Sequence, residues 1–146
     1  MPDPLDLTGD IAAAIDGAAL RGATLALAYV RADLSPGVSF RGSTHVHGPT
    51  ELALWARKRD SGLVEAIAER PRVSLVYYGG PDGPGPMFLS IEGRARVAPE
   101  LNDEVWSAII EGERKQDPER KGVAVLIEVD SVAGAGGDGF FQQARV

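Results

Sequence analysis

The feature that most constrains the fold is a succession of short strand patterns separated by turns instead of long helices. Strand patterns are found at residues 24–31, 38–42, 51–57, 72–78, 87–97 and 123–133. A parallel doubly wound sheet needs a long helix between successive strands, so this order of elements argues against it. A mainly β fold with short helices is expected, in which about six mostly antiparallel strands form a small split β-barrel.

Short helices are predicted at three places. Apolar residues recur at helical spacing over residues 11–20 and again from Ser61 onward. Pro71 is expected to end the second helix, because the residue before a proline avoids the helical region. The third helix is predicted over residues 99–112, where a proline lies in the first turn.

The chain length is typical of one domain, and residues 1–146 are expected to form one. Residues 1–9 and the glycine-rich stretch 134–146 are expected to be flexible. Gly93 interrupts the longest strand pattern and indicates a bulge or bend at that point.

Composition excludes several classes of function. The chain has no cysteine, so it forms no disulfide, thiolate metal site or cysteine nucleophile. A net charge of −6 argues against a nucleic-acid partner, because phosphate backbones attract positive fields. No stretch has the ~20 apolar residues of a membrane span, and the acidic start of the chain is unlike a signal peptide. We therefore expect a cytoplasmic protein whose anion sites, if any, are local.

A basic cluster stands out in this acidic chain. Arg57, Lys58 and Arg59 follow an apolar strand, and Ser61 and Gly62 come at the start of the next helix. Backbone N–H groups at a helix N-terminus attract anions, and arginine can make a two-pronged contact with phosphate. The cluster therefore predicts a phosphate site, although it would also suit a solvated strand end.

A second candidate follows the strand at 38–42. Arg41, Gly42, Ser43 and Thr44 combine a cation, a small residue and two hydroxyl groups. This combination could complete a phosphate site if it faces the basic cluster. An ordinary approach to a hairpin has the same composition.

Other motifs carry no prediction of chemistry. His45 and His47 lie on one face of an extended segment, but only Glu51 is near enough in sequence to complete a zinc site, so no metal is expected. The sequence "GAGGDG" at 134–139 matches a dinucleotide fingerprint but is too close to the chain end to open a helix. No catalytic side chain is predicted, because the chain has no nucleophile elbow.

Taken together, the segments resemble the pyridoxamine 5′-phosphate oxidase-like, FMN-binding split-barrel family. The resemblance rests on "TELALWARKRDSGLVEAIAERPRVSLVYY" (50–78), "LSIEGRARV" (89–97) and "KGVAVLIEVDSVAG" (121–134). These segments match the family's apolar strand, basic turn, short helix, G-x-A-x-V strand and closing strand, in that order.

The resemblance implies a homodimer with a flavin bound at each end of the subunit interface. It also implies that Arg57, Lys58 and Ser61 hold the cofactor phosphate. Arg41 and Ser43 would form a second group around it, together with Gly42 and Gly62 of the same two segments.

The resemblance further implies that Trp55 and Ala56 lie along the flavin ring. The second strand, "GVSFRGSTHVHG" (37–48), lacks the aromatic residues that many relatives carry there. The resemblance implies FMN as the cofactor, and this departure leaves the deazaflavin F420 open as the alternative, with haem, which another branch of the superfamily binds, as a third.

The implied activity is an oxidoreductase that transfers a hydride to or from an unknown small molecule, without the substrate residues of a true pyridoxamine phosphate oxidase. A non-catalytic flavin- or haem-binding protein and a dimer without a cofactor remain as alternatives.

Overall fold

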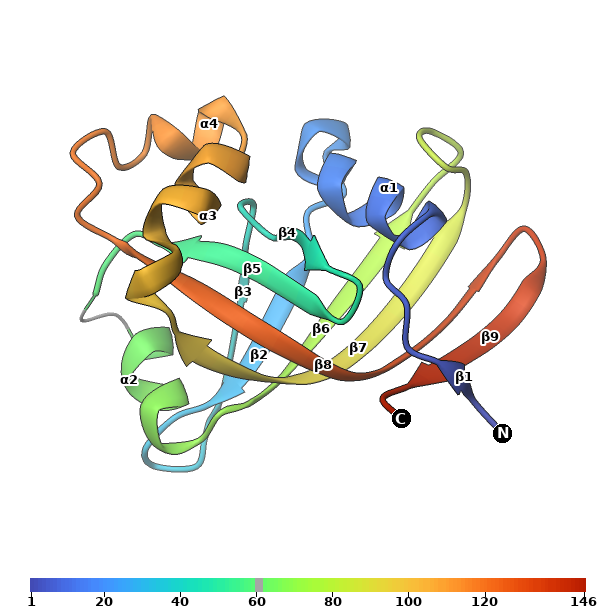
Figure 1. Ribbon diagram of the computed structural model, residues 1–146, viewed down its shortest axis with the longest axis horizontal. Helices are drawn as coiled ribbons and strands as arrows, with labels where there is room; N and C mark the ends of the chain where they lie inside the picture. The colour runs from blue at the N-terminus through green and yellow to red at the C-terminus, as the bar shows by residue number, and fades with distance from the viewer. Residues whose placement is uncertain (60–61) are drawn as a thin grey trace.

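The computed structural model describes residues 1–59 and 62–146 of the chain. Its elements, in chain order, are β1 (Asp3–Pro4), α1 (Asp10–Gly17), η1 (Ala19–Arg21), β2 (Ala26–Val30), β3 (Pro36–Phe40), β4 (His45–Gly48), β5 (Glu51–Ala56), α2 (Gly62–Glu69), β6 (Arg72–Gly79), β7 (Met87–Val97), η2 (Pro99–Leu101), α3 (Asn102–Ala108), α4 (Glu111–Arg114), β8 (Val123–Gly136) and β9 (Gly139–Ala144). None of the described helices is long and apolar enough to cross a bilayer. Most of the elements are strands, so the protein is mainly β, as expected (Figure 1).

The strands form one strongly curved sheet in the order β1-β9-β8-β7-β6-β2-β3, with β5 and β4 branching from β8. Strand β8 makes this branch possible because it is 14 residues long. It pairs with β7 along one edge, while the other edge pairs first with β5 and then with β9. Within the described residues no ladder joins β3 to β4, so the barrel is split at these edge strands.

The main core lies inside this curve. It is lined by alternate residues of the strands, such as Leu27, Leu54, Leu75, Ile91 and Ile127, all of which are almost fully buried. Helix α1 packs on β4, adds its own apolar face to the core and covers one opening of the barrel (Figure 1). Alternation with period two therefore gives each central strand one buried face.

A smaller apolar cluster lies outside the barrel. Ala53 and Trp55 of β5 turn away from the main core and pack with Val105 of α3 and with Ile109, which follows this helix. Strand β5 is therefore buried on both faces, which explains its nearly continuous apolar sequence.

The predicted strand count of six is wrong, because the described residues form nine strands. The additional strands are β1, β4 and β9, and β1 pairs with β9 in parallel, so the sheet is mixed. Strand β4 lies outside the six predicted strand ranges. It is short and forms a ladder only because β5 lies beside it.

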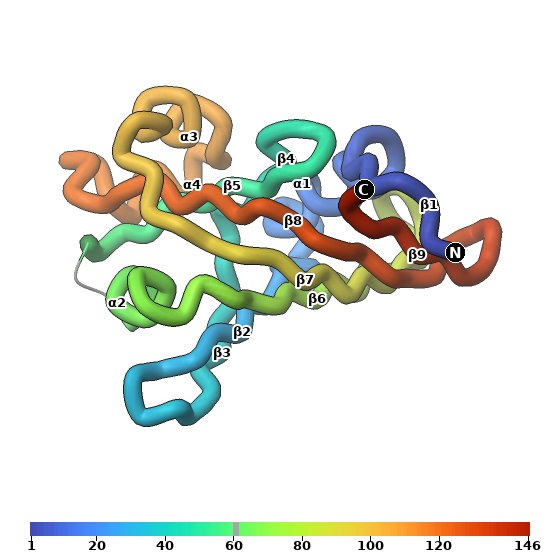
Figure 2. Tube along the Cα trace, turned by 60° about the horizontal axis from the view of Figure 1, so that its bottom comes forward, coloured from blue at the N-terminus to red at the C-terminus, as the bar shows by residue number. Residues whose placement is uncertain are grey.

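Both segments that were expected to be flexible, residues 1–9 and 134–146, contain strands. Residues 134–136 extend β8, and residues 139–144 form β9 as a hairpin partner of β8. In the segment 1–9, Leu5 and Leu7 are buried in the main core. Figure 2 shows both termini at this end of the sheet, where β1 lies beside β9.

Two internal predictions had different outcomes. The bulge predicted at Gly93 is confirmed, because the register with β8 shifts between Glu92 and Gly93. The single helix predicted over 99–112 is instead divided into η2, α3 and α4, since Ile109 and Ile110 have extended backbones.

Candidate functional site

The basic residues come together at one end of the barrel. A pocket of about 510 Å³ is lined by Arg41, Arg57, Lys58, Gln116, Asp117 and Lys121. Arg41 follows the end of β3, the 57–58 pair follows the end of β5, and the last three belong to the connection between α4 and β8. The pocket, which we call the cationic pocket, thus gathers three segments that are far apart in sequence.

The cations of the first two segments have no partner of opposite charge in residues 1–59 and 62–146. Among the described residues, no carboxylate lies within ion-pair distance of Arg41, Arg57 or Lys58. By contrast, Arg94 contacts Asp130 at 2.9 Å on the outer sheet face. Three neighbouring cations of an acidic chain are therefore without a carboxylate partner in the part of the chain that the structure describes.

Arg41 is the most constrained of these cations. Its side chain is half-buried, and its buried Nε has no hydrogen-bond partner among the described residues. Burial lowers the pKa of the Arg41 guanidinium; nearby Tyr29 opposes this effect, and the positive charge of Arg57 adds to it. A buried N–H donor without an acceptor is costly, so this position favours an anionic ligand.

Asp117 holds the α4–β8 connection against the end of β5. Its carboxylate accepts hydrogen bonds from Trp55 Nε1 at 2.9 Å, Lys121 N at 2.9 Å and Gly122 N at 2.8 Å. Burial by itself would raise the pKa of Asp117, but these N–H donors lower it below its ordinary value. A Cβ at Gly122 would collide with the carbonyl oxygen of Ala56, so the close approach requires glycine.

Three of the predicted site residues have side chains that are committed elsewhere. The Ser43 hydroxyl accepts from Trp55 N at 2.9 Å and donates to Trp55 O at 3.3 Å. The Trp55 indole is buried and meets Trp106 edge-to-face, at 5.2 Å between ring centroids. Ala56 points into the main core. A ligand beside these residues could therefore reach Trp55 and Ala56 only through the backbone.

Two further predicted positions, Gly42 and Gly62, are not among the residues that line the pocket. A Cβ at Gly42 would lie 3.2 Å from the carboxyl carbon of Glu113, so the backbone passes close to that side chain. Gly62 begins α2 and is exposed. Ser61 lies outside the described residues.

The two histidines do not form a metal site with other described residues, among which no group of three ligands gathers. His45 is buried, and its Nδ1 lies 2.9 Å from Ser43 O. His47 lies 3.9 Å from the carboxylate of Glu104. His45 therefore makes a contact within its own segment, whereas His47 of β4 lies near α3.

Sequence reasoning missed Gln116, Asp117 and Lys121. The pattern "QDPERKG" (116–122) predicts an ordinary connection, and it is one. Nothing local indicates that this connection folds back onto β5. An aspartate followed by a proline, with a glycine five residues after the aspartate, was the available signal, and it is a weak one.

No family model matches the chain, and no curated protein sequence matches it. Solved structures do match. One is a pyridoxamine 5′-phosphate oxidase-related, FMN binding protein from Nostoc punctiforme PCC 73102, with a TM-score of 0.66 and 13% identity over 90% of this chain and 83% of that chain. The chain has the fold of the pyridoxamine 5′-phosphate oxidase-related proteins.

Two further structures support the same fold. General Stress Protein 26 from Bacillus anthracis str. Sterne has a TM-score of 0.60 and 20% identity, over 77% of this chain and 83% of its own. An F420 Reductase has a TM-score of 0.58 and 18% identity, over 77% of this chain and 90% of its own. The resemblance seen in the sequence is thus confirmed in the fold.

Proposed function

We propose that this protein is an oxidoreductase that binds FMN, with the cofactor phosphate in the cationic pocket. The observation that carries the proposal is the gathering of Arg41, Arg57 and Lys58 in one pocket of an acidic protein, without a carboxylate partner among the described residues. The proposal is supported by the fold, which this chain shares with FMN-binding proteins.

The pocket residues suit a phosphate group. Arg41 offers a half-buried guanidinium whose Nε–H has no acceptor among the described residues, and Arg57 lies close enough to lower its pKa. Lys58 adds a third positive charge at the exposed rim. Arginine forks match phosphate oxygens, and a lysine supplies a mobile point charge. Ser61 was expected to add a hydroxyl and stays a prediction.

The cofactor would supply the hydride chemistry, while the protein binds it, orients it and excludes water. No side chain needs to act as a nucleophile, and the substrate would be a small molecule. F420 is the alternative cofactor, because an F420 Reductase has the same fold and an anionic phosphate-linked tail would also suit the pocket.

We further propose that the protein is a homodimer. Large apolar side chains are exposed on the outer sheet face, namely Val38, Phe40, Val76, Tyr78, Phe88 and Phe140. The strand register brings these residues onto one face. Contiguous exposed apolar patches commonly mark interaction sites, and a two-fold interface would bury the same patch on both copies.

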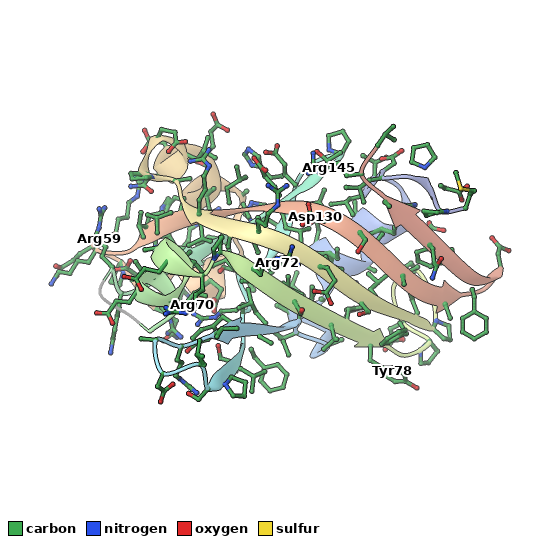
Figure 3. All side chains as sticks on the ribbon, turned by 90° about the horizontal axis from the view of Figure 1, so that it is seen from below. Arg59, Arg70, Arg72, Tyr78, Asp130 and Arg145 are labelled. Carbon is green, nitrogen blue, oxygen red and sulfur yellow. The ribbon has the colours of Figure 1, made fainter. Side chains whose placement is uncertain are left out.

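The test is a spectroscopic titration of the protein with FMN and, separately, with F420. We expect a Kd better than ~100 μM for one of them, which corresponds to about −5.5 kcal/mol. Arg57→Gln should weaken binding at least tenfold. Arg72→Gln should not, because Arg72 is exposed on the sheet face and does not line the pocket. Figure 3 shows Arg72 away from Arg59, which follows the pocket residues Arg57 and Lys58 in the chain. Failure of both cofactors to bind would refute the proposal.

A further inference from the structure

One buried titratable side chain lies outside the cationic pocket. His45 is 8% exposed, and the strand register places it opposite Ala53, which belongs to the smaller apolar cluster outside the barrel. Residues directly opposite each other in a ladder point to the same face of the sheet. The imidazole therefore lies on the face of β4 that continues the apolar outer face of β5, where a charge is poorly solvated.

The hydrogen bond of His45 fixes which ring nitrogen carries the proton. Nδ1 lies 2.9 Å from Ser43 O, and because a carbonyl oxygen only accepts, Nδ1–H is the donor. Nε2 of the neutral ring is then unprotonated, and this buried atom has no hydrogen-bond partner among the described residues. A second proton would create a buried charge and an N–H at Nε2 that finds no acceptor there. The site therefore favours the neutral imidazole.

The charged side chains around this ring do not compensate for a second proton. They come from four elements packed around the segment: Asp16 of α1, His47 of β4, Glu104 of α3 and Glu113 of α4. Asp16 would favour a protonated ring, but its Oδ1 already accepts from Val46 N at 2.8 Å. His47 opposes a charge on His45, and the two glutamates lie against other residues of the segment. Burial is the largest effect and lowers the pKa of His45 below its ordinary value of 6.5, although Ser43 O and Asp16 raise it.

His45 ends a turn that carries one wall of the cationic pocket. Thr44 N and Thr44 Oγ1 both donate to Arg41 O, at 3.2 Å and 2.8 Å. Ser43 Oγ accepts from Trp55 N at 2.9 Å, and Ser43 O accepts from the His45 ring. Residues 41–45, which we call the 41–45 turn, are thus joined to one another and to β5. A displacement of the ring would reach Arg41 through this short chain of hydrogen bonds.

We infer that the 41–45 turn is a pH-sensitive switch. At neutral pH the neutral His45 ring holds the turn closed against β5. In mild acid the ring takes up a proton and leaves its buried position for water, so the turn opens and Arg41 moves away from the cationic pocket. The consequence for flavin affinity rests on the proposed function, whereas the opening of the turn does not.

The size of the effect follows from linkage between protonation and opening. The ring of the open turn is in water and binds a proton at a pKa of about 6.5, whereas the ring of the closed turn binds it only at lower pH. The closed turn is therefore most stable above about pH 6.5, and its stability is lost as the pH falls toward the lower pKa of the buried ring. The equilibrium constant for opening should rise roughly five- to tenfold between pH 7.5 and pH 5.5.

Amide hydrogen exchange, measured by NMR at these two pH values, tests the switch without any ligand. The amides of Thr44 and Trp55 report on the turn, because they donate to Arg41 O and Ser43 Oγ. Their protection factors, corrected for the intrinsic exchange rate at each pH, should fall by the factor given above. The amide of Ile91 in the central strand β7 is the reference and should keep its protection.

Two variants assign the effect to one ring. His45→Asn removes the titrating group and keeps a side-chain N–H that can donate to Ser43 O, so the protection of the turn should no longer depend on pH. His47→Asn is the matched control, because it is the same substitution two residues later on the same strand. It should keep the full effect of the wild type. A titration of the His45 ring by NMR in the wild type should give a pKa below 6.5, whether or not the variants fold.

Three outcomes overturn the inference: equal protection of the turn at both pH values in the wild type, an undiminished pH effect in His45→Asn, or a ring pKa at or above 6.5. FMN titrations at the same pH values test the connection to Arg41. The affinity should fall at least threefold more in the wild type than in His45→Asn, and equal losses in both proteins would overturn this connection. If neither FMN nor F420 binds at pH 7.5, the proposed function fails, and the exchange measurements alone decide on the switch.

Discussion

Replacing Asp117 tests how the cationic pocket is built. Its carboxylate accepts three hydrogen bonds, at 2.8–2.9 Å, from Trp55 Nε1 and the amides of Lys121 and Gly122. A hydrogen bond to a charged group contributes roughly 1.5–3 kcal/mol, and bonds in one network are not additive. We therefore expect Asp117→Ala to lower the free energy of unfolding by about 3–5 kcal/mol.

Asp117→Asn should cost less, because its carbonyl oxygen can replace Oδ2 and still accept from Trp55 and Gly122. Its amide group would then face the Lys121 N–H, so one donor would lose its acceptor. The expected loss is about 1–3 kcal/mol. Urea unfolding, followed by tryptophan fluorescence and circular dichroism, measures both variants.

The pH dependence of this difference has a definite sign. The pKa of Asp117 is lowered in the folded protein, because its N–H donors outweigh the effect of burial. Its contribution to stability is therefore present above the ordinary aspartate pKa of about 3.9 and is lost as the pH falls through the lower folded value. The gap between the wild type and Asp117→Asn should stay constant near neutral pH and narrow below about pH 4.

The control is Asp82→Asn, the same chemical change at an exposed carboxylate, and it should alter stability by less than about 0.5 kcal/mol. A double-mutant cycle with Trp55→Phe isolates the indole bond, whose coupling energy should exceed about 1 kcal/mol. If Asp117→Ala unfolds at the same urea concentration as Asp82→Asn, Asp117 does not anchor the connection and the account of the pocket is wrong.

Two further predictions concern the sheet. Tyr78→Glu should convert the proposed dimer to a monomer, because Tyr78 is 81% exposed on the apolar face and each copy would bury a charge. Sedimentation equilibrium at micromolar concentration measures the mass, and Tyr78→Phe should remain a dimer. An unchanged mass for the Glu variant would argue against this interface. Leu34→Gly should raise the free energy of unfolding by about 1 kcal/mol, because Leu34 has φ 67° in the β2–β3 turn. Leu34→Ala keeps the backbone penalty, so its free energy of unfolding should rise little. Equal thermal midpoints for the Gly and Ala variants would refute this reasoning.

The six predicted strand positions correspond to strands of the sheet, and their success has a local cause. The pattern over residues 87–97 has the same bounds as β7, because alternation of apolar and polar residues is a property of a few consecutive residues. The bulge at Gly93 could be predicted because a glycine within a strand pattern is also a local feature of the sequence. Strand β9 could not be predicted, since its exposed and partly buried residues lack this alternation and it is ordered by pairing with β8.

Only part of the candidate site could be predicted from the sequence. Arg57 and Lys58 stand out because they are adjacent cations in an acidic chain, and Arg41 stands out beside a glycine and two hydroxyl residues. The sequence could not predict whether these cations line the same pocket, because this depends on how the ends of β3 and β5 approach each other across the split in the barrel. Trp55 was expected beside a cofactor, yet its indole lies under α3, because β5 is covered on both faces.

By itself, the sequence determined the strand-rich fold class, the position of the bulge and the presence of unusual cations, all of which follow from the types of neighbouring residues. Only the tertiary structure decided which cations share a pocket, that Asp117 holds Gln116 and Lys121 beside them, and that three of the cations lack a carboxylate partner among the described residues. The reason is physical: local patterns set the conformation of short segments, whereas the charge of a pocket depends on distances between segments that only the folded chain brings together.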